Sequence, residues 1–436
     1  MSLGLIGNNI PKHWKSPFLV DLVTPKQWKT IPTKNLIEKG YVVYGANGKI
    51  GFYSEYTHEK PTLMITCRGA TCGNLHISEP CSYINGNAMA LDSQPTDLVS
   101  LEFLFYALKA RGLEDTISGS AQPQITGKGL QEVGVPLPPL AEQKVIAEKL
   151  DTLLAQVEMT KTRLESTLET LKQFRQSVLA AAVSGKLTDI DDFKAESFDK
   201  LIEEMRNGLS PKPNDDGLGY PILRISSVRS LEIDTSDIRY LECDELIRER
   251  YALKADDLLF TRYNGSLDFV GVCGLFKGCK YETLLYPDKL IRVRTNTSKL
   301  LPQYAEIYFS SPDVRSLVTN FVKSTSGQKG ISGKDLKSVV VKYPTIVEQK
   351  RVIGMVEKLF TGADATEQQV NQALERVNNL SQSILAKAFR GELTEQWRKE
   401  NPDLISGENS AEALLKKIKA ERAAAKPKRK ARTTSA

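Results

Sequence analysis

Pro138-Pro-Leu-Ala-Glu-Gln-Lys144 and Pro344-Thr-Ile-Val-Glu-Gln-Lys350 are two versions of one short sequence, and each belongs to a longer repeated stretch. The first stretch runs from Gly127 to Thr188, and adding 206 to its residue numbers aligns it with the second stretch without a gap. About a third of the paired positions are identical. Solenoid repeats recur every 20–50 residues or so, so this longer, distant copy indicates a duplicated structural unit.

Apolar residues recur at intervals of three and four along both copies, which is typical of a coiled-coil seam. Proline precedes each pattern, and Gly185 and Gly391 follow where a left-handed cap would end a helix. Each copy therefore predicts a helix of about 44 residues, roughly 66 Å long. The chain between the copies must return, which favours an antiparallel pair over two helices in unrelated bundles. The residues expected to pack the helices together are Leu154, Val157, Leu164, Leu168, Leu171, Val178, Phe360, Val370, Leu374, Val377 and Ile384.

Polar residues interrupt this seam at matching places in the two copies. Lys161 and Arg175 do so in the first copy, and Glu367 and Ser381 in the second.

The composition is that of an ordinary globular protein, with 41% hydrophobic and 26% charged residues in a chain of 436. This length predicts two or three domains. The sequence has no apolar run of about 18 residues and no signal peptide, and its six cysteines are scattered, so we expect a cytoplasmic protein without a membrane partner. The net charge of +6 permits an anionic partner without requiring one.

The remaining segments predict an α+β protein with a pseudo-two-fold internal repeat. Two mixed domains are expected to be separated by the two long helices. The expected segments are a first mixed domain (1–126), a first spacer helix region (127–188), a linker (189–213) with a short helix at 198–205, a second mixed domain (214–332), a second spacer helix region (333–397), and a C-terminal helix with a basic tail (398–436).

Short apolar runs bounded by turns predict the strands of the mixed domains. The Asn-Gly pair that follows residues 41–44 predicts a hairpin. The other expected strands are 62–66, 220–225, 257–261, 269–274 and 289–294, and the expected helices are 101–108, 302–309 and 312–322.

Motifs for catalysis are missing from the sequence. The glycine-rich stretch at 327–335 has the wrong spacing for a phosphate-binding loop, and Asp335 stands where a Ser or Thr would bind magnesium. Cys67, Cys72, His76 and Cys81 could close a zinc site, but their spacing fits a zinc knuckle only loosely. The alternative that we favour is a set of small buried cysteines, so no metal site is assigned.

Polar and basic residues in the turns of the mixed domains could contact DNA. Arginine, asparagine and glutamine can pair with base edges, and lysine can hold phosphates. Ordinary solvated turns carry the same residue types. The candidates are Asn47, Lys49, Arg68, Asn74, Gln122 and Gln124 in the first domain, and Arg262, Tyr263, Asn264, Ser266, Gln328 and Lys329 in the second.

The stretch 138–150, with its echo at 348–350, is similar to the conserved central region of type I restriction-modification specificity subunits. The resemblance continues through 41–48, 220–228, 257–266 and 326–332, and residues 386–397 resemble the enteric K-like subfamily. It covers nearly the whole chain and is most specific in the second half.

This resemblance implies a non-catalytic subunit of a bacterial enzyme, without a cofactor of its own. In that family two target recognition domains each read one half of a bipartite, asymmetric site in double-stranded DNA. The helices dock two modification subunits, which bind S-adenosylmethionine and methylate adenine. Restriction subunits, which use ATP and magnesium, join that core. The bases read and the spacer length do not follow from the resemblance.

Two other classes of function are weighed against this one. A solitary DNA methyltransferase or nuclease would need an Asn/Asp-Pro-Pro-Phe/Tyr motif or a carboxylate cluster, and the sequence has neither. A coiled-coil adaptor without a DNA role would leave two unlike domains on like helices unexplained.

Overall fold

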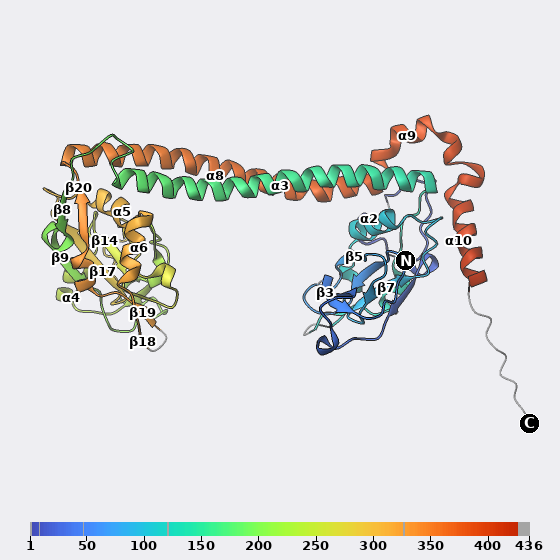
Figure 1. The fold of residues 1–436 in the computed structure, drawn as a ribbon, viewed down its shortest axis with the longest axis horizontal. Coiled ribbons are helices and arrows are strands. Elements are labelled where there is room, and N and C mark those ends of the chain that lie inside the picture. Colours follow the sequence, from blue (N-terminus) through green and yellow to red (C-terminus); the bar gives the residue numbers. More distant parts are fainter. Residues whose placement is uncertain (1, 8, 47, 120–121, 326–327, 426–436) are drawn as a thin grey trace, which may run out of the picture. The chain divides into compact units, whose positions relative to one another are not determined.

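The computed structural model describes residues 2–7, 9–46, 48–119, 122–325 and 328–425, and these form two compact units. Unit 1 comprises Met1–Arg163 and Ala373–Ala436, and unit 2 comprises Leu164–Gln372. Each unit contains half of both long helices and one mixed domain (Figure 1). The mixed domain of unit 1 is called domain 1, and that of unit 2 is called domain 2. Among the described residues, none of the helices has the length and apolarity needed to cross a lipid bilayer.

The two long helices have the predicted length. Helix α3 spans Leu140–Val183 and helix α8 spans Ile346–Phe389, with 44 residues in each. Gly185 and Gly391, which follow them, adopt φ of 84° and 76°. A side chain at either position would be strained in this left-handed region, which confirms the predicted ends of both helices.

The helices run antiparallel within each unit. In unit 1 the first half of α3 packs against the last half of α8, with Leu150 and Ile384 in one buried cluster. In unit 2 the second half of α3 packs against the first half of α8, with Val178 and Val356 in another. Of the expected packing residues, Val157, Val178, Val370 and Ile384 are buried, and Leu154, Leu164, Leu168, Leu171, Phe360, Leu374 and Val377 are partly buried.

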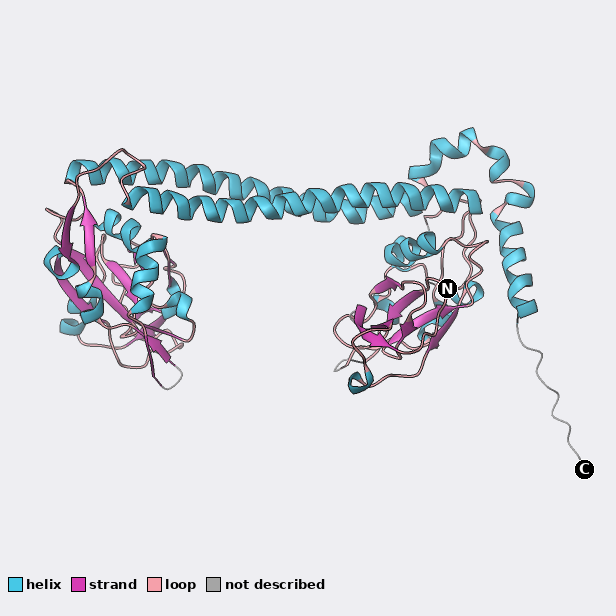
Figure 2. Ribbon diagram, in the orientation of Figure 1, coloured by secondary structure: helices cyan, strands magenta, loops and turns pink. Residues whose placement is uncertain are grey.

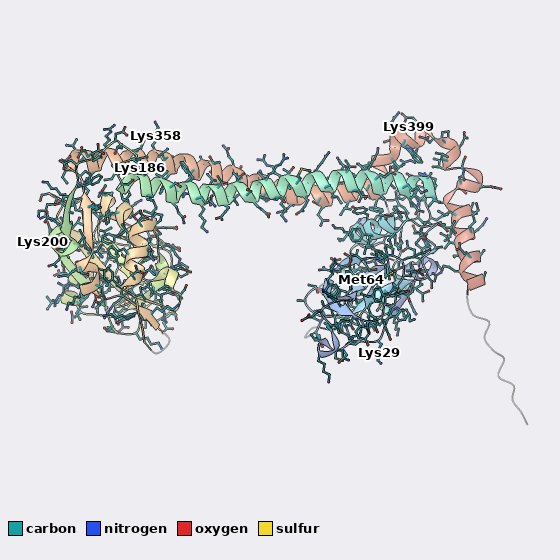
Figure 3. The ribbon with its side chains drawn as sticks, in the orientation of Figure 1. Lys29, Met64, Lys186, Lys200, Lys358 and Lys399 are labelled. Atoms are coloured by element: carbon teal, nitrogen blue, oxygen red, sulfur yellow. The ribbon has the colours of Figure 1, made fainter. Side chains whose placement is uncertain are left out.

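Domain 1 contains sheets of strand order β1-β7-β4-β5 and β3-β2-β6 (Figure 2). Its core includes Met64 of β4, which is fully buried (Figure 3). The strands of unit 1 are β1 (Thr24–Gln27), β2 (Tyr41–Gly45), β3 (Gly48–Tyr53), β4 (Leu63–Thr66), β5 (Leu75–Ile77), β6 (Tyr83–Ile84) and β7 (Ala88–Asp92). Its other α-helices are α1 (Leu19–Leu22), α2 (Leu101–Arg111), α9 (Glu395–Glu400) and α10 (Ala411–Ala425).

Domain 2 is built around a sheet of order β16-β14-β17-β9, with a smaller sheet of order β15-β19-β18. The strands of unit 2 are β8 (Lys194–Ser197), β9 (Ile202–Asn207), β10 (Tyr220–Leu223), β11 (Val228–Arg229), β12 (Glu232–Ile233), β13 (Ile238–Leu241), β14 (Leu258–Thr261), β15 (Tyr263–Asn264), β16 (Cys273–Leu275), β17 (Leu290–Thr295), β18 (Lys323–Thr325), β19 (Gln328–Gly330) and β20 (Val340–Tyr343). Its other α-helices are α4 (Glu245–Tyr251), α5 (Pro302–Ser310), α6 (Pro312–Asn320) and α7 (Gly333–Ser338).

Two sequence-based expectations for the segment 189–213 were wrong. It is not a simple linker, because β8 pairs with β20 and β9 pairs with β17. The expected helix at 198–205 is a 3-10 turn (Phe198–Leu201) followed by β9. The charges that made the segment look solvated are paired across the sheet: Glu204 lies 2.9 Å from Arg292 and 3.1 Å from Arg294.

The strand expected at 269–274 is displaced toward the C-terminus. The observed strand β16 begins at Cys273, because Gly271 takes a φ of 66° that a regular strand cannot contain. The strands expected at 41–44, 62–66, 220–225, 257–261 and 289–294 correspond to β2, β4, β10, β14 and β17 and are confirmed.

One repeated residue joins each domain to its long helix in the same way. Gln143 donates to the Pro138 carbonyl at 3.1 Å and accepts from the Ser100 amide, just before α2, at 3.1 Å. Gln349 donates to Pro344 at 3.0 Å and accepts from the Leu301 amide, just before α5, at 2.8 Å. The repeated Glu-Gln-Lys sequence therefore orients both domains through its buried glutamine.

Candidate nucleic-acid interface

Four of the candidate residues of domain 1 lie together in two neighbouring loops. Arg68 and Gln124 face each other in an antiparallel bridge. The Gly69 amide donates to the Pro123 carbonyl at 3.1 Å, which ties the loop after β4 to the segment that leads toward α3. Arg68, Asn74, Gln122 and Gln124 are all exposed on these loops. They form one polar surface because long-range backbone bonds bring their loops together.

The hairpin between β2 and β3 adjoins this surface. The Ala46 carbonyl, at the hairpin turn, accepts from the Thr66 hydroxyl at 2.7 Å and from the Thr71 hydroxyl at 3.3 Å. Asn47, the next residue, lies outside the described residues. Lys49 is exposed and pairs with Glu79, and this hydrogen bond raises the pKa of Lys49. A phosphate would therefore compete with the Glu79 carboxylate for the Lys49 ammonium group.

The candidate residues of domain 2 meet at the small sheet β15-β19-β18, which lies at the end of unit 2 remote from α3 and α8 (Figure 1). Tyr263 pairs with Gly330 and Asn264 with Lys329. A Cβ atom on Gly330 would come within 2.3 Å of the Tyr263 ring, so this ring rests directly on backbone. Asn264 is held by its Oδ1, which accepts from the Ser266 amide at 3.0 Å. The side chain of Gln328 lies outside the described residues.

Arg262 also lies against the Tyr263 ring. Its guanidinium carbon lies 4.7 Å from the centre of the Tyr263 ring, and its Nη1 donates to the Asp288 carbonyl at 3.4 Å. Its Nε is buried and makes no hydrogen bond among the described residues. Arg262 is half-buried, so its geometry suits positioning the ring better than reaching outward.

The four residues considered for zinc do not come together as a metal site. Among the described residues, no group of three or more potential ligands could hold a metal ion. Cys67 is buried and bonds to Gln27 at 2.9 Å, and burial raises the pKa of its thiol. Both observations are those of a structural cysteine.

Sequence analysis missed a second group of polar residues beside Tyr263. Arg224, Arg239, Lys212 and Lys289 line a hollow of about 510 Å³ in domain 2. These cations are dispersed over nearly 80 positions of sequence, so only the fold brings them together. Arg224 directly follows β10 in the structure, whereas the strand expected from the sequence at 220–225 included it.

Two of the four polar interruptions of the helix seam, Arg175 and Glu367, belong to an ion-pair network in unit 2. Arg175 of α3 donates to Glu367 at 2.7 Å and to Asp364 at 2.5 Å. Burial opposes the charge of Arg175, but these hydrogen bonds raise its pKa above the usual value. The seam therefore contains a charge pair of the kind that can specify register in coiled coils.

A repeated frame that carries two different polar surfaces defines a two-module binding scaffold. Comparison with known proteins gives the family. Residues 11–170 match the model of the type I restriction modification DNA specificity domain.

Curated relatives match over most of their length. The type I restriction enzyme EcoKI specificity subunit of Escherichia coli (strain K12) is 54% identical over 372 residues, which cover 83% of this chain and 79% of that protein. The StySPI specificity subunit of Salmonella potsdam is 37% identical, over 92% of this chain and 86% of that protein. The chain therefore belongs to the family of type I restriction enzyme specificity subunits, which are non-catalytic.

Solved structures share the fold. A chain from a study of complex assembly and conformational transition of the type I R-M system superposes with a TM-score of 0.68 at 17% identity, covering 88% of this chain and 99% of that one. The HsdS subunit from Thermoanaerobacter tengcongensis gives a TM-score of 0.51 at 17% identity, covering 88% of this chain and 98% of that chain. At these identities the likeness concerns the fold alone.

Proposed function

We propose that this chain selects the DNA site of a type I restriction-modification enzyme. Domain 1 and domain 2 each read one half of a split, asymmetric site in double-stranded DNA, and α3 and α8 set the distance between the halves. The observation that carries the proposal is the duplicated frame: Gln143 and Gln349 join like helices to domains whose exposed loops differ. Two equivalent helical supports that carry two different binding surfaces suit a DNA site whose two halves differ in sequence.

The DNA contacts that we propose follow from the two polar surfaces. In domain 1 they are Asn47, Lys49, Arg68, Asn74, Gln122 and Gln124. In domain 2 they are Tyr263, Asn264, Ser266, Gln328 and Lys329, with Arg262 acting through the Tyr263 ring.

The partners follow from family membership. Two modification subunits dock on the long helices, and restriction subunits join that core. S-adenosylmethionine is bound by the modification subunits, and ATP and magnesium by the restriction subunits. This chain supplies the choice of sequence and no reacting group.

Methylation by purified components tests the division of labour. The chain alone should transfer no methyl group from S-adenosylmethionine to DNA, and adding modification subunits should produce methylation at one bipartite sequence. Robust methyl transfer by the isolated chain would overturn the proposal. Methylation by the assembly at unrelated sequences would also overturn it, because the chain would then select nothing.

Lengthening both helices tests their role as a spacer. Seven residues added after Thr167 and seven after Ala373 keep the heptad seam and lengthen each helix by about 10 Å. Because one base pair rises about 3.4 Å, the unchanged half-sites should be read with up to about three more base pairs between them. One added residue turns the following helix segment by about 100° and should break the seam. An unchanged spacer in the methylation map of the seven-residue variant would show that the helices do not set the distance.

A further inference from the structure

The hollow beside Tyr263 is a second polar surface of domain 2. It has a volume of about 510 Å³, and its cationic side chains are Lys212, Arg224, Arg239 and Lys289. A smaller hollow of about 160 Å³ adjoins it and contains Tyr263 and Asn264. Lys289 and Ile225 line both hollows, so the two hollows are neighbours that share part of their walls.

Carboxylates fix the direction of both arginines in the larger hollow. Asp215 accepts from Arg239 Nε at 2.7 Å and from Arg239 Nη2 at 2.5 Å. Asp215 also accepts from Arg224 Nη2 at 3.2 Å, and Asp237 lies 3.4 Å from Arg224 Nε. Each guanidinium thus directs its Nε and Nη2 side toward a carboxylate. The Nη1 ends of both arginines are turned the other way.

The backbone near the arginines is also held. The Arg224 amide donates to the Ser227 hydroxyl at 2.9 Å, and the Ser227 hydroxyl donates to the Asp237 carbonyl at 2.6 Å. Arg224 and Arg239 therefore project from a braced corner of β10 and β13 rather than from a free loop.

The charge balance favours reading a base edge over trapping a small anion. Four cations line the hollow, while Asp288 in its wall and the two bracing carboxylates carry three negative charges. The excess is therefore a single positive charge, which is weak attraction for a free anion. A fixed, planar pair of N–H groups instead matches the O6 and N7 acceptors of guanine in the major groove.

The lysines complement the arginines. Lys212 and Lys289 are exposed and end in flexible ammonium groups, which hold phosphates as point charges. Lys289 also places this charge next to the Tyr263 and Asn264 surface.

We propose that this hollow is a DNA-reading site of domain 2, in which Arg239, with Arg224 beside it, reads a guanine edge while Lys212 and Lys289 hold neighbouring phosphates. The inference rests on the proposed function and assigns its residues. It makes Arg239 a specificity-determining residue and the two lysines residues of general affinity.

The test uses the chain assembled with its modification subunits and two fluorescein-labelled duplexes of equal length. One duplex carries the bipartite sequence found by methylation mapping, and the other has a random sequence. Arg239→Lys keeps the charge but loses the planar fork. It should reduce discrimination between the duplexes by about 5- to 150-fold, mainly through weaker binding to the duplex that carries the bipartite sequence. The methylation map should then accept other bases in place of one guanine of the second half-site.

The lysine variant separates affinity from specificity. Lys212→Gln with Lys289→Gln should weaken binding to both duplexes and make the slope of log K against log salt shallower by about 2. The matched control is Lys200→Gln with Lys254→Gln, which removes the same charge from exposed positions of unit 2 outside the hollow and outside the long helices. The control should keep the wild-type slope. Unchanged unfolding midpoints for all variants show that the effects do not come from misfolding.

The outcomes distinguish the two proposals. If the wild-type assembly does not discriminate between the duplexes, the proposed function itself fails. If it discriminates and the lysine variant matches the control, the hollow does not hold phosphates and this inference is overturned. If Arg239→Lys keeps the wild-type map, or the second half-site contains no guanine, the base-reading assignment is overturned.

Discussion

Glu142 and Glu348 occupy the same position in the two copies of Glu-Gln-Lys, yet the structure treats them differently. Glu142 is fully buried in unit 1. Glu348 in unit 2 is partly exposed and accepts hydrogen bonds only from Thr345 among the described residues, at 3.1 Å from the amide and 2.8 Å from the hydroxyl. The neighbouring glutamines, in contrast, make equivalent bonds in both units.

The difference arises from what lies beside each glutamate. Glu142 accepts from Trp14 Nε1 at 2.9 Å, Thr394 Oγ1 at 2.7 Å and Arg398 Nη1 at 2.8 Å, and it lies 3.2 Å from His13 Nε2. These partners come from the N-terminal segment and from the segment after α8. Glu142 thus joins segments that the chain order keeps almost 400 residues apart.

In unit 2, the junction between the mixed domain and the ends of α3 and α8 has a similar arrangement but lacks this network. Leu137 forms an antiparallel β-bridge with Lys15 in unit 1. Its repeat partner, Tyr343, pairs with Lys194 between β20 and β8 in unit 2. Thr188, the repeat partner of Thr394, has a buried hydroxyl with no hydrogen bond among the described residues. A direct covalent connection from α3 to β8 replaces the ionic connection of unit 1. We infer that unit 1 needs the buried carboxylate because its corner is assembled from two separate segments.

Replacing the two glutamates should give the largest difference in unfolding free energy between the two units. Glu142→Ala leaves the charge of Arg398 without its partner. Because Arg398 is only 16% exposed, unit 1 should lose about 3–5 kcal/mol of unfolding free energy. Glu348→Ala removes a capping interaction and should cost about 1 kcal/mol. Urea unfolding followed by circular dichroism, to which the helices of both units contribute, measures both variants, and tryptophan fluorescence from Trp14, Trp28 and Trp397 follows unit 1 separately. Equal shifts for both variants would contradict the special role of Glu142.

The glutamines should instead behave alike. Gln143→Ala and Gln349→Ala each leave a backbone amide and a proline carbonyl without their partner, at a cost of about 2 kcal/mol each. Gln349→Ala also removes the hydrogen bond to the Lys299 carbonyl. Hydrogen exchange should accelerate at the start of α2 in the first variant and at the start of α5 in the second. An effect in only one unit would show that the shared sequence does not have a shared role.

The two repeated threonines should also differ between the units, with a smaller change in unfolding free energy. Thr394→Val removes the hydroxyl that bonds to Glu142 and should cost about 1–2 kcal/mol. Thr188→Val replaces a hydroxyl without a partner by a methyl group, so it should be neutral or slightly stabilising. Thermal unfolding of the two variants, which carry the same chemical change, measures the difference directly. Destabilisation by Thr188→Val would reveal a partner for that hydroxyl.

The helix seam provides the smallest expected effect. Arg175→Glu places like charges beside Glu367 and Asp364 and should destabilise unit 2, whereas adding Glu367→Arg should recover part of the loss. Glu367 is 42% exposed, and solvent screens the pair, so the coupling should be about 1 kcal/mol. A double-mutant cycle in circular dichroism, repeated at high salt, measures it. Strictly additive changes would show that the two charges do not stabilise each other.

The sequence predicted what depends on local periodicity and on glycine. The spacing of apolar residues gave both 44-residue helices, and Gly185 and Gly391 marked their ends correctly. It failed for the segment 189–213, whose polar and charged composition suggested a linker, because β9 pairs with β17 there and Glu204 forms an ion pair with Arg292. A charged residue in a sequence does not show whether an oppositely charged residue lies on the neighbouring strand of a sheet.

The candidate site, like the fold, has one part that the sequence predicted and another that only the tertiary structure showed. The sequence located the turns around Arg68 and Tyr263, because such turns follow strands that can be recognised. Only the tertiary structure gave Arg262 its place against the Tyr263 ring and gathered Lys212, Arg224, Arg239 and Lys289 around one hollow. It also decided that Glu142 is buried and Glu348 is not. Helix periodicity is fixed by residues a few positions apart, whereas the role of a charged side chain depends on partners hundreds of residues away.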